Sequence, residues 1–223
     1  MKSINMKTIL IFIAIVATSI ANAQTINWAS VKPEHKHVIH ANVGWDYAAA
    51  YGVGYSYVMH TKFQQALTAQ FSAPAGNNLW DDLKVEGTYQ MRLVNLKNFN
   101  VITSATANFR RFESSYLRTN SFGNKFTAVA GYYRPRWFAA AEAGFDKAIA
   151  THIANGKRYL ENYPAAVDGW YVPTGGNLNF GIQGGFSLKN IDITLKTGVL
   201  KDQSGNANPI VPFYFQVGVN KRF

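Results

Sequence analysis

Apolar and polar residues alternate along most of this chain, and this period of two constrains the fold more than any other feature. In Ile39–Tyr47 the odd positions are apolar or aromatic, and the even positions are polar or small. Tyr51–Met59 repeats the pattern, with glycine and serine between its tyrosines and valines. Successive side chains of a β-strand point to opposite faces, so each segment predicts a strand with one apolar face.

Ten segments alternate in this way, and none of the positions on their apolar faces carries a charge. The polar faces are rich in Gly, Asn, Gln, Ser and Thr, whereas the polar face of a soluble sandwich carries many charges. Apolar faces of this kind suit lipid, where every backbone group must be paired internally, so the sheet must close on itself. The ten predicted strands are Ile39–Tyr47, Tyr51–Met59, Phe63–Phe71, Leu83–Leu93, Phe99–Phe109, Phe126–Tyr132, Trp137–Phe145, Leu178–Leu188, Ile191–Val199 and Val211–Val219.

The predicted fold is therefore all-β: a single closed antiparallel transmembrane β-barrel of ten strands, with eight strands as the alternative. The lengths of the connections support this fold, because short and long connections alternate as they do between the periplasmic turns and the outer loops of such barrels. The short connections are His60–Lys62, Asn95–Asn98, Tyr133–Arg136 and Lys189–Asn190. The longer ones are Ser72–Asp82, Arg110–Lys125, Asp146–Asn177 and Lys201–Ile210.

Residues 1–23 have the layout of a secretory signal peptide. Lys2 and Lys7 precede the apolar run TILIFIAIVATSI, and Ala21 and Ala23 supply the small residues of a cleavage site before Gln24. The run is short for a membrane anchor, which needs ~20 apolar residues. We therefore predict a signal peptide followed by a barrel domain over residues 24–223.

The formal net charge is +10, and the chain has no cysteine. A basic balance favours anionic partners, and for an exported protein these are outer-membrane lipid and lipopolysaccharide, with no nucleic acid. The absence of cysteine excludes disulfides and thiolate chemistry. No cofactor is predicted.

One stretch is compatible with two structures. Phe138, Ala141, Phe145, Ile149 and Ile153 follow helical spacing. Gly144 and the alternation after Trp137 favour a strand instead. The choice between strand and helix stays open at this point for residues 146–162.

Charged residues on the inward faces predict a network inside the barrel. A ten-stranded barrel is narrow, so opposite charges would pair across the lumen and fill it. The alternative is a narrow polar pore that favours small anions. The predicted network consists of Asp46, Lys84, Glu86, Arg92, Glu142, Asp192 and Lys196.

Residues suited to catalysis or to metal binding are sparse. Asp81, Asp82, His152 and Asp168 are the candidates for an outer-rim enzyme, but no spacing among them indicates a nucleophile with its base. His35 and His37 would point the same way on a strand, yet no carboxylate stands at matching spacing. We predict neither an enzyme nor a metal site.

Two outer loops combine aromatic and basic residues, which are the usual anchors of protein interfaces. They are candidates for docking a partner. The residues concerned are Arg111, Tyr116, Arg118, Tyr159, Tyr163, Trp170 and Tyr171.

The chain ends FYFQVGVNKRF, and this stretch resembles the closing strand of bacterial outer-membrane barrels. The resemblance implies that Phe215, Val217, Val219 and Phe223 form a signal for the barrel-assembly machinery. Lys221 departs from the pattern, because an apolar residue is usual there.

The stretches WFAAAEAGFDKAIATHI, DGWY and PTGGNLNFGIQGG, with the terminal strand, resemble small outer-membrane β-barrel proteins of Bacteroidota type. The resemblance covers mostly the C-terminal half. It implies a fold and a location, the bacterial cell outer membrane, and it carries no catalytic residues.

The leading prediction for function is a non-enzymatic scaffold or accessory subunit of a larger outer-membrane complex. The second is a narrow pore for small polar or anionic solutes, and the third is a lipid-facing outer-membrane enzyme. The identity of a partner or solute does not follow from the sequence.

Overall fold

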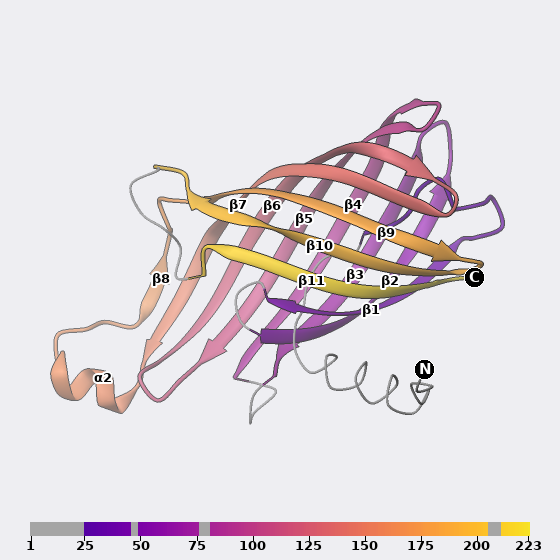
Figure 1. The fold of residues 1–223 in the computed structure, drawn as a ribbon. Helices are drawn as coiled ribbons and strands as arrows, with labels where there is room; N and C mark the ends of the chain where they lie inside the picture. Colours follow the sequence, from indigo (N-terminus) through magenta and orange to yellow (C-terminus); the bar gives the residue numbers. More distant parts are fainter. Residues whose placement is uncertain (1–24, 46–48, 76–80, 205–210) are drawn as a thin grey trace, which may run out of the picture.

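The computed structural model describes residues 25–45, 49–75, 81–204 and 211–223 and forms one closed antiparallel β-barrel (Figure 1). Ten strands make the wall, which confirms the predicted fold and strand number. They are β1 (His37–Trp45), β2 (Ala49–His60), β3 (Gln64–Pro74), β4 (Asp82–Leu96), β5 (Phe99–Glu113), β6 (Leu117–Arg134), β7 (Trp137–Asn155), β9 (Asn177–Leu188), β10 (Ile191–Asp202) and β11 (Phe213–Arg222).

Each wall strand pairs with its neighbours in the chain, apart from the small insertion between β7 and β9, and the first strand pairs with the last. The ladder between β1 and β11 runs from Val38 opposite Arg222 to Trp45 opposite Phe215. A ladder between β6 and β7 completes the ring. No wall strand therefore keeps an open edge along the barrel, as a sheet surrounded by lipid requires.

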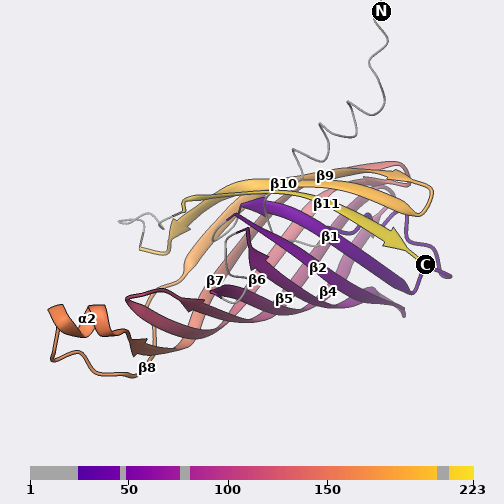
Figure 2. The ribbon, with the colours of Figure 1, turned by 90° about the horizontal axis from the view of Figure 1, so that it is seen from below.

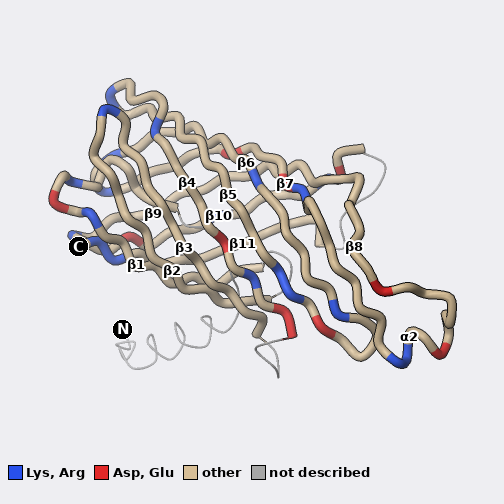
Figure 3. The backbone as a smooth tube through the Cα atoms, turned by 180° about the vertical axis from the view of Figure 1, so that it is seen from behind, with Lys and Arg blue, Asp and Glu red and all other residues tan. Residues whose placement is uncertain are grey.

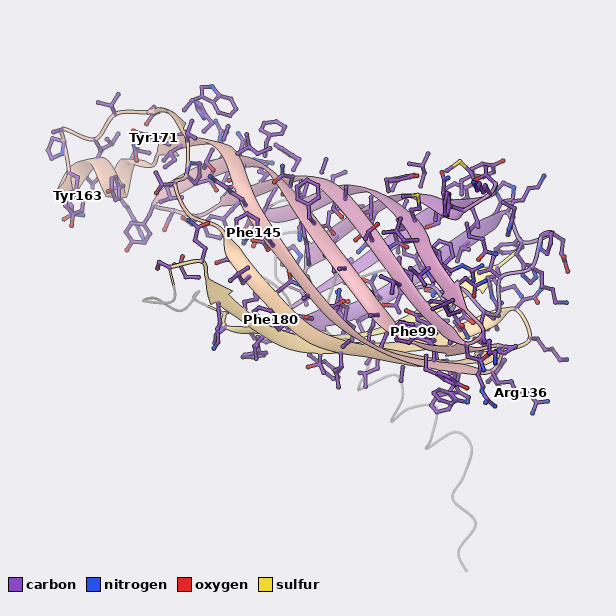
Figure 4. The ribbon with its side chains drawn as sticks, turned by 90° about the horizontal axis from the view of Figure 1, so that it is seen from above. Phe99, Arg136, Phe145, Tyr163, Tyr171 and Phe180 are labelled. Carbon is purple, nitrogen blue, oxygen red and sulfur yellow. The ribbon has the colours of Figure 1, made fainter. Side chains whose placement is uncertain are left out.

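The two ends of the barrel differ. The C-terminus lies at the end with the short turns β2–β3, β4–β5, β6–β7 and β9–β10, which we call the inner end (Figures 1 and 2). The opposite end, the outer end, extends into a projection made by the tops of β6 and β7 (Figure 2). In Figure 4, Phe99 and Arg136 lie at the inner end, and Tyr163 and Tyr171 lie at the tip of the outer end.

The outward faces of the wall are apolar, as the period of two predicts. Large apolar side chains on these faces are solvent-accessible in the isolated chain, among them Ile182 (64%), Phe186 (68%) and Leu195 (47%). Rings also mark the two rims: Trp45 and Phe213 stack at the outer rim with centroids 6.3 Å apart, and Tyr132 and Trp137 lie 5.7 Å apart at the inner rim. The wall is thus an apolar belt with aromatic borders.

Strands β6 and β7 are longer than expected, and this is where the loop predictions were wrong. The predicted loop Arg110–Lys125 is mostly strand, because β5 continues to Glu113 and β6 begins at Leu117. Strand β7 continues to Asn155 instead of ending at Phe145. Neighbouring strands supply the pairing that the local sequence pattern does not indicate, because alternation of apolar residues fades above the apolar belt.

Residues 146–162 are strand first and helix afterwards. Strand β7 continues through the helically spaced residues, with a bulge opposite Phe122 and Gly123. A short helix, α2 (Lys157–Asn162), follows, and β8 (Gly169–Tyr171) then pairs with the top of β7. The part of the chain that the structure describes contains no helix long and apolar enough to cross a bilayer.

Candidate functional site

Residues 25–36, which we call the plug segment, enter the barrel at its inner end. Residues 25–31 fill the lumen there, whereas Lys32, Pro33, Glu34 and Lys36 are exposed. The plug segment precedes β1 and folds back inside the barrel. Ile26, Trp28 and Val31 are 2%, 3% and 6% exposed, so they are as buried as the core of a soluble protein. The plug segment was not predicted from the sequence.

The wall around the plug segment is apolar on its inward face, unlike the rest of the lumen. Plug and wall together form one buried apolar cluster. A buried contact of this kind is stabilised by removal of apolar surface from water. The inward wall residues of the cluster are Val38, Val58, Ala66, Ile102, Val129, Tyr133, Phe138 and Ala140.

Buried hydrogen bonds fix the plug segment to the wall. Thr25 donates from Oγ1 to Oε1 of Gln183 at 2.7 Å, and Asn220 donates from Nδ2 to the carbonyl oxygen of Thr25 at 2.7 Å. Asn27 donates from Nδ2 to Oγ of Ser187 at 2.8 Å and to the carbonyl oxygen of Arg134 at 2.9 Å. These contacts satisfy polar groups that would be costly to bury alone.

Arg222 joins three parts of the inner end. Its Nη2 lies 3.0 Å from Oδ1 of Asp192, and both side chains are 1% exposed. Nη2 also donates to the carbonyl oxygen of Lys189 at 2.7 Å, and Nη1 donates to the carbonyl oxygen of Ser30 in the plug segment. The last charged residue of the chain therefore links β11, β10 and the plug segment.

His35 lies at the exit of the plug segment and is buried. The backbone N–H of Lys32 donates to its Nδ1 at 3.2 Å, so this nitrogen is an acceptor and carries no proton. Burial, followed by the positive charge of Arg222, lowers the pKa of His35 from its ordinary value of 6.5. The nearby carboxylate of Glu34 raises it, and Lys32 lowers it further. The docked plug segment thus favours neutral His35.

Beyond the plug segment, the lumen is polar and contains a cavity of about 90 Å³. Thr25, Ile26 and Trp28 border this cavity from the plug side. The remaining lining is rich in Thr, Ser and Gln, with three lysines and two glutamates. The cavity is large enough for several waters. The charged lining residues are Lys84, Glu86, Lys125, Glu142 and Lys196.

A cluster of charged and polar groups lies along the inward face of the neighbouring strands β7, β9, β10 and β11, beside the cavity. Lys196 Nζ on β10 lies 2.8 Å from Oε2 of Glu142 on β7, and Tyr214 Oη on β11 donates to Oε1 of Glu142 at 2.5 Å. Gly181 and Gly198 make room for this ring, since an added Cβ would lie 2.1 and 2.3 Å from Tyr214 Oη. These inward glycines provide space for a larger neighbour.

The structure arranges the predicted charge network as separate pairs at different heights. Lys84 and Glu86 are 3.0 Å apart on one strand, and Glu142 pairs with Lys196. Asp192 pairs with Arg222, a residue outside the predicted network. Arg92 faces inward on β4 opposite Ile102, and Asp46 lies outside the described residues. The functional role of these residues stays a prediction.

The predicted docking residues all lie on or beside the projection at the outer end. Tyr116, Tyr163 and Trp170 are 52%, 60% and 62% exposed. Trp170 stacks on Phe122 at 6.2 Å. Tyr159 and Tyr163 form a second ring pair at 5.0 Å. Tyr171 donates from its hydroxyl to the carbonyl oxygen of Val167 at 2.8 Å.

Arg111 and Arg118 lie on the strands of the projection. Arg111 is paired with Glu113, and Arg118 is exposed at the start of β6. The aromatic candidates therefore offer free ring surface, whereas one of the two basic candidates is already partnered.

The terminal residues Phe215, Val217 and Val219 lie on the outward face of β11, and Phe223 follows it. Lys221 shares this face, with its Nζ 5.8 Å from the Phe223 ring centroid. Their role as an assembly signal stays a prediction.

The residues weighed for catalysis have structural contacts. Arg110 binds Asp82 through two hydrogen bonds of 2.8 and 2.7 Å. Asp168 accepts two hydrogen bonds of 2.8 Å from Asn155, and the His152 ring meets Trp170 edge-on at 5.1 Å. These contacts order the outer end.

The prediction that His35 and His37 share a strand face was wrong, because β1 begins at His37. His35 is buried, whereas His37 is exposed and bonds Tyr55 Oη at 2.6 Å. Among the described residues, no group of three or more His, Asp and Glu side chains could hold a metal ion.

A signal for the plug segment does exist in the sequence. Ile26, Trp28 and Val31 follow the predicted cleavage site closely, and apolar residues such as Val58, Ile102 and Phe138 interrupt the polar faces near the inner ends of strands. The apolar residues after the cleavage site and the apolar residues on the inward strand faces each lack an apolar partner within the wall. Together they indicate that the two sets pack against each other.

Comparisons with known proteins identify no family. No protein-family model matches the chain, and no curated protein matches it. Among 27 solved chains with a similar fold is one described as "KdgM porin", with 9% sequence identity and a TM-score of 0.41. The match covers 83% of this chain and 99% of that one. A likeness this weak carries no inference about solute or mechanism.

Proposed function

We propose that this barrel is a narrow outer-membrane pore for small polar or anionic solutes, closed in the described state by the plug segment. The single observation that carries the proposal is the change of character along the lumen. A polar cavity with a surplus of lysine stands directly above an apolar plug that belongs to the chain but not to the wall.

A membrane location is supported by the outer surface. The belt of exposed Phe, Leu, Ile and Val residues surrounds the wall, and a soluble monomer rarely exposes a contiguous apolar surface of that size. A closed barrel is the form in which strands cross lipid, with short turns on the periplasmic side. The predicted signal peptide agrees with export. The inner end would then face the periplasm.

The preference for anions follows from the charges that line the cavity. Three lysines and two glutamates leave one positive charge in excess. Glu142 is held by Lys196 and Tyr214, and Glu86 lies 3.0 Å from Lys84. Lys125 is the lysine that these two pairs leave in excess. A narrow space with a net positive lining concentrates anions and repels cations.

The plug segment is suited to act as a closure because it contributes no strand to the wall. The ten ladders that close the barrel involve none of residues 25–36. Withdrawal of this segment would leave these ten ladders intact. The cost would fall on Ile26, Trp28 and Val31, since full burial of a large apolar side chain contributes about 1.5–3 kcal/mol.

Planar-bilayer recording tests the proposal. The wild-type barrel should be closed most of the time, and a variant that lacks residues 25–34 should conduct steadily. A matched control lacks residues 157–166, which removes the same length from the outer end; it should behave like the wild type. Absence of current through the first variant, with the barrel folded by its gel shift on boiling, would contradict the pore.

A scaffold or accessory subunit is the second candidate, and one observation favours it. The projection carries Trp170, Tyr171 and Tyr163 on its surface beyond the apolar belt. Exposed Trp and Tyr are frequent anchors of interfaces. Under this candidate, a partner co-purifies in mild detergent and is released by W170A/Y171A. The control W45A/F213A removes an exposed ring pair from the rim and should retain the partner. Purification of a bare monomer from the native membrane would contradict this candidate.

A further inference from the structure

Basic side chains surround the inner end, and we propose that they bind anionic phospholipid headgroups of the periplasmic leaflet. The proposal rests on the membrane location proposed above but not on conduction. The residues, which we call the basic ring, are Lys62, Lys97, Arg134, Arg136, Lys189 and Lys221. All six are exposed.

The ring follows the whole circumference. Each of the four short turns at the inner end carries at least one member, and Lys221 stands on the last strand. Blue therefore predominates at this end in Figure 3, whereas the outer end mixes both signs. Among the described residues, Glu34 and Asp192 are the acidic side chains at the inner end, and they pair with Lys32 and Arg222.

None of the ion pairs between described residues includes a member of the basic ring. Ring members lie beside apolar or aromatic side chains instead. Lys62 Nζ is 5.9 Å from the Phe63 ring centroid, Arg134 Cζ is 5.3 Å from that of Tyr132, and Lys221 Nζ is 5.8 Å from that of Phe223.

The other members of the ring follow the same rule in sequence. Lys97 comes after Leu96, which is 67% exposed, and Lys189 comes after Leu188, which is 63% exposed. Arg136 precedes the outward-facing Trp137. A cation directly beside a lipid-facing side chain lies at the boundary between hydrocarbon and headgroups, where long basic side chains extend towards phosphate.

Two turns keep a lysine where the backbone disfavours it. Lys97 and Lys189 have φ angles of 55° and 52°, and they are the two non-glycine residues with positive φ among the described residues. Gly or Asn adopts this conformation at less cost. Both turns read Leu-Lys-Asn, so asparagine follows the lysine instead of replacing it. Two-residue hairpins use turns with positive φ, and in both turns the residue at that position is a lysine, which points to a function for the charge.

The arrangement fits lipid better than an acidic protein. A protein partner would contact one face of the inner end, whereas the ring is spread around the wall at one level and is bordered by apolar side chains. Phospholipid phosphates surround a barrel in the same way. Because the inner end has the short turns, the leaflet concerned is the periplasmic one, and lipid A of the outer leaflet is not the source of these phosphates.

Native mass spectrometry of the detergent-solubilised full barrel tests the proposal, with phosphatidylglycerol and phosphatidylcholine of identical chains as probes. The wild type should prefer phosphatidylglycerol. The variant K62Q/K97N/K189N should lose at least about tenfold of this preference, since one basic residue near an anionic surface contributes about fivefold. The asparagines suit positive φ, so this variant should fold at least as well as the wild type.

Two matched variants decide the result. K147Q/K157Q/K201Q removes the same charge from the outer end and should keep the preference, and K62R/K97R/K189R should also keep it. An unchanged preference in K62Q/K97N/K189N, or an equal loss in K147Q/K157Q/K201Q, would overturn the proposal. Ring-dependent binding of soluble polyglutamate without preference between the lipids would overturn it in favour of an acidic protein. Bilayer current through the barrel lacking residues 25–34 is independent of all these outcomes.

Discussion

The inner and outer parts of the lumen are built on the same ten strands but differ in how far water reaches their side chains. The inner part is dry: Arg222 and Asp192 are each 1% exposed, and apolar side chains fill the space around the plug segment. The outer part is wet: Lys84 and Glu86 are 15% and 12% exposed beside the cavity. The comparison teaches that a regular wall determines which way side chains point, while their chemistry along the axis determines whether the interior is a core or a conduit.

Replacing Trp28 by alanine should produce the largest change, because it breaks the dry part directly. Loss of a buried tryptophan destabilises a packed state by about 3–5 kcal/mol. Bilayer recording should therefore show openings on the order of 100-fold more frequent than in the wild type. The control Trp170→Ala removes an exposed tryptophan from the projection. Equal opening in the two variants would contradict a closing role for Trp28.

Removing one partner of an ion pair should reduce the stability of the folded barrel much more in the inner part of the lumen than in the outer part. Arg222→Gln leaves Asp192 buried without its charge partner, and such losses destabilise by about 3–5 kcal/mol. Lys84→Gln affects a pair that water reaches, so about 1 kcal/mol or less is expected. Urea unfolding of the barrel from vesicles measures both. Equal effects would mean that the inner part is as hydrated as the outer part.

Acid should favour release of the plug segment through His35. Its pKa is lowered in the docked state, so docking is fully stabilised above pH 6.5, the ordinary value, and loses stability as the pH falls below it. Between pH 7.5 and 5.5 the frequency of opening should rise by at most about tenfold. The variant His35→Gln should lose this dependence. A wild-type frequency that fell with acid would contradict the sign.

Charge reversal in the wet part should have the smallest effect, a several-fold change in ion selectivity. Lys84→Glu places a second carboxylate beside Glu86 and reverses the net charge of the cavity lining. In the barrel that lacks residues 25–34, the reversal potential in a KCl gradient should shift from anion towards cation preference. Lys201→Glu, outside the cavity lining, serves as the control. A shift of the reversal potential of the same size in that control would contradict a role of the cavity lining in ion selectivity.

The wall was predictable from the sequence because its signal is local. Alternation along ten segments gives the strands, and uncharged apolar faces indicate closure in lipid. The tops of β6 and β7 were missed because apolar and polar residues stop alternating regularly above the belt. Residues 117–125 and 146–155 are held in strands by pairing between these distant segments. The alternation of residues along a segment does not show which other segment pairs with it.

The site was only partly predictable for the same reason. Inward orientation of Glu142 and Lys196 follows from the alternation, but their 2.8 Å contact depends on strand register. The plug segment has no regular alternation, although it is buried like a core. Its position inside the barrel can therefore be predicted only together with the apolar inward residues that surround it.

The central claim is that residues 25–31 occupy the lumen of the folded barrel, and cysteine labelling tests it most directly because the chain has no cysteine. Thr25 is 4% exposed, and Lys36 is exposed at the exit of the plug segment. A charged maleimide added to the refolded barrel in vesicles should label Lys36→Cys rapidly and Thr25→Cys only after denaturation. Equal labelling rates of the two cysteines in the folded barrel would contradict the account.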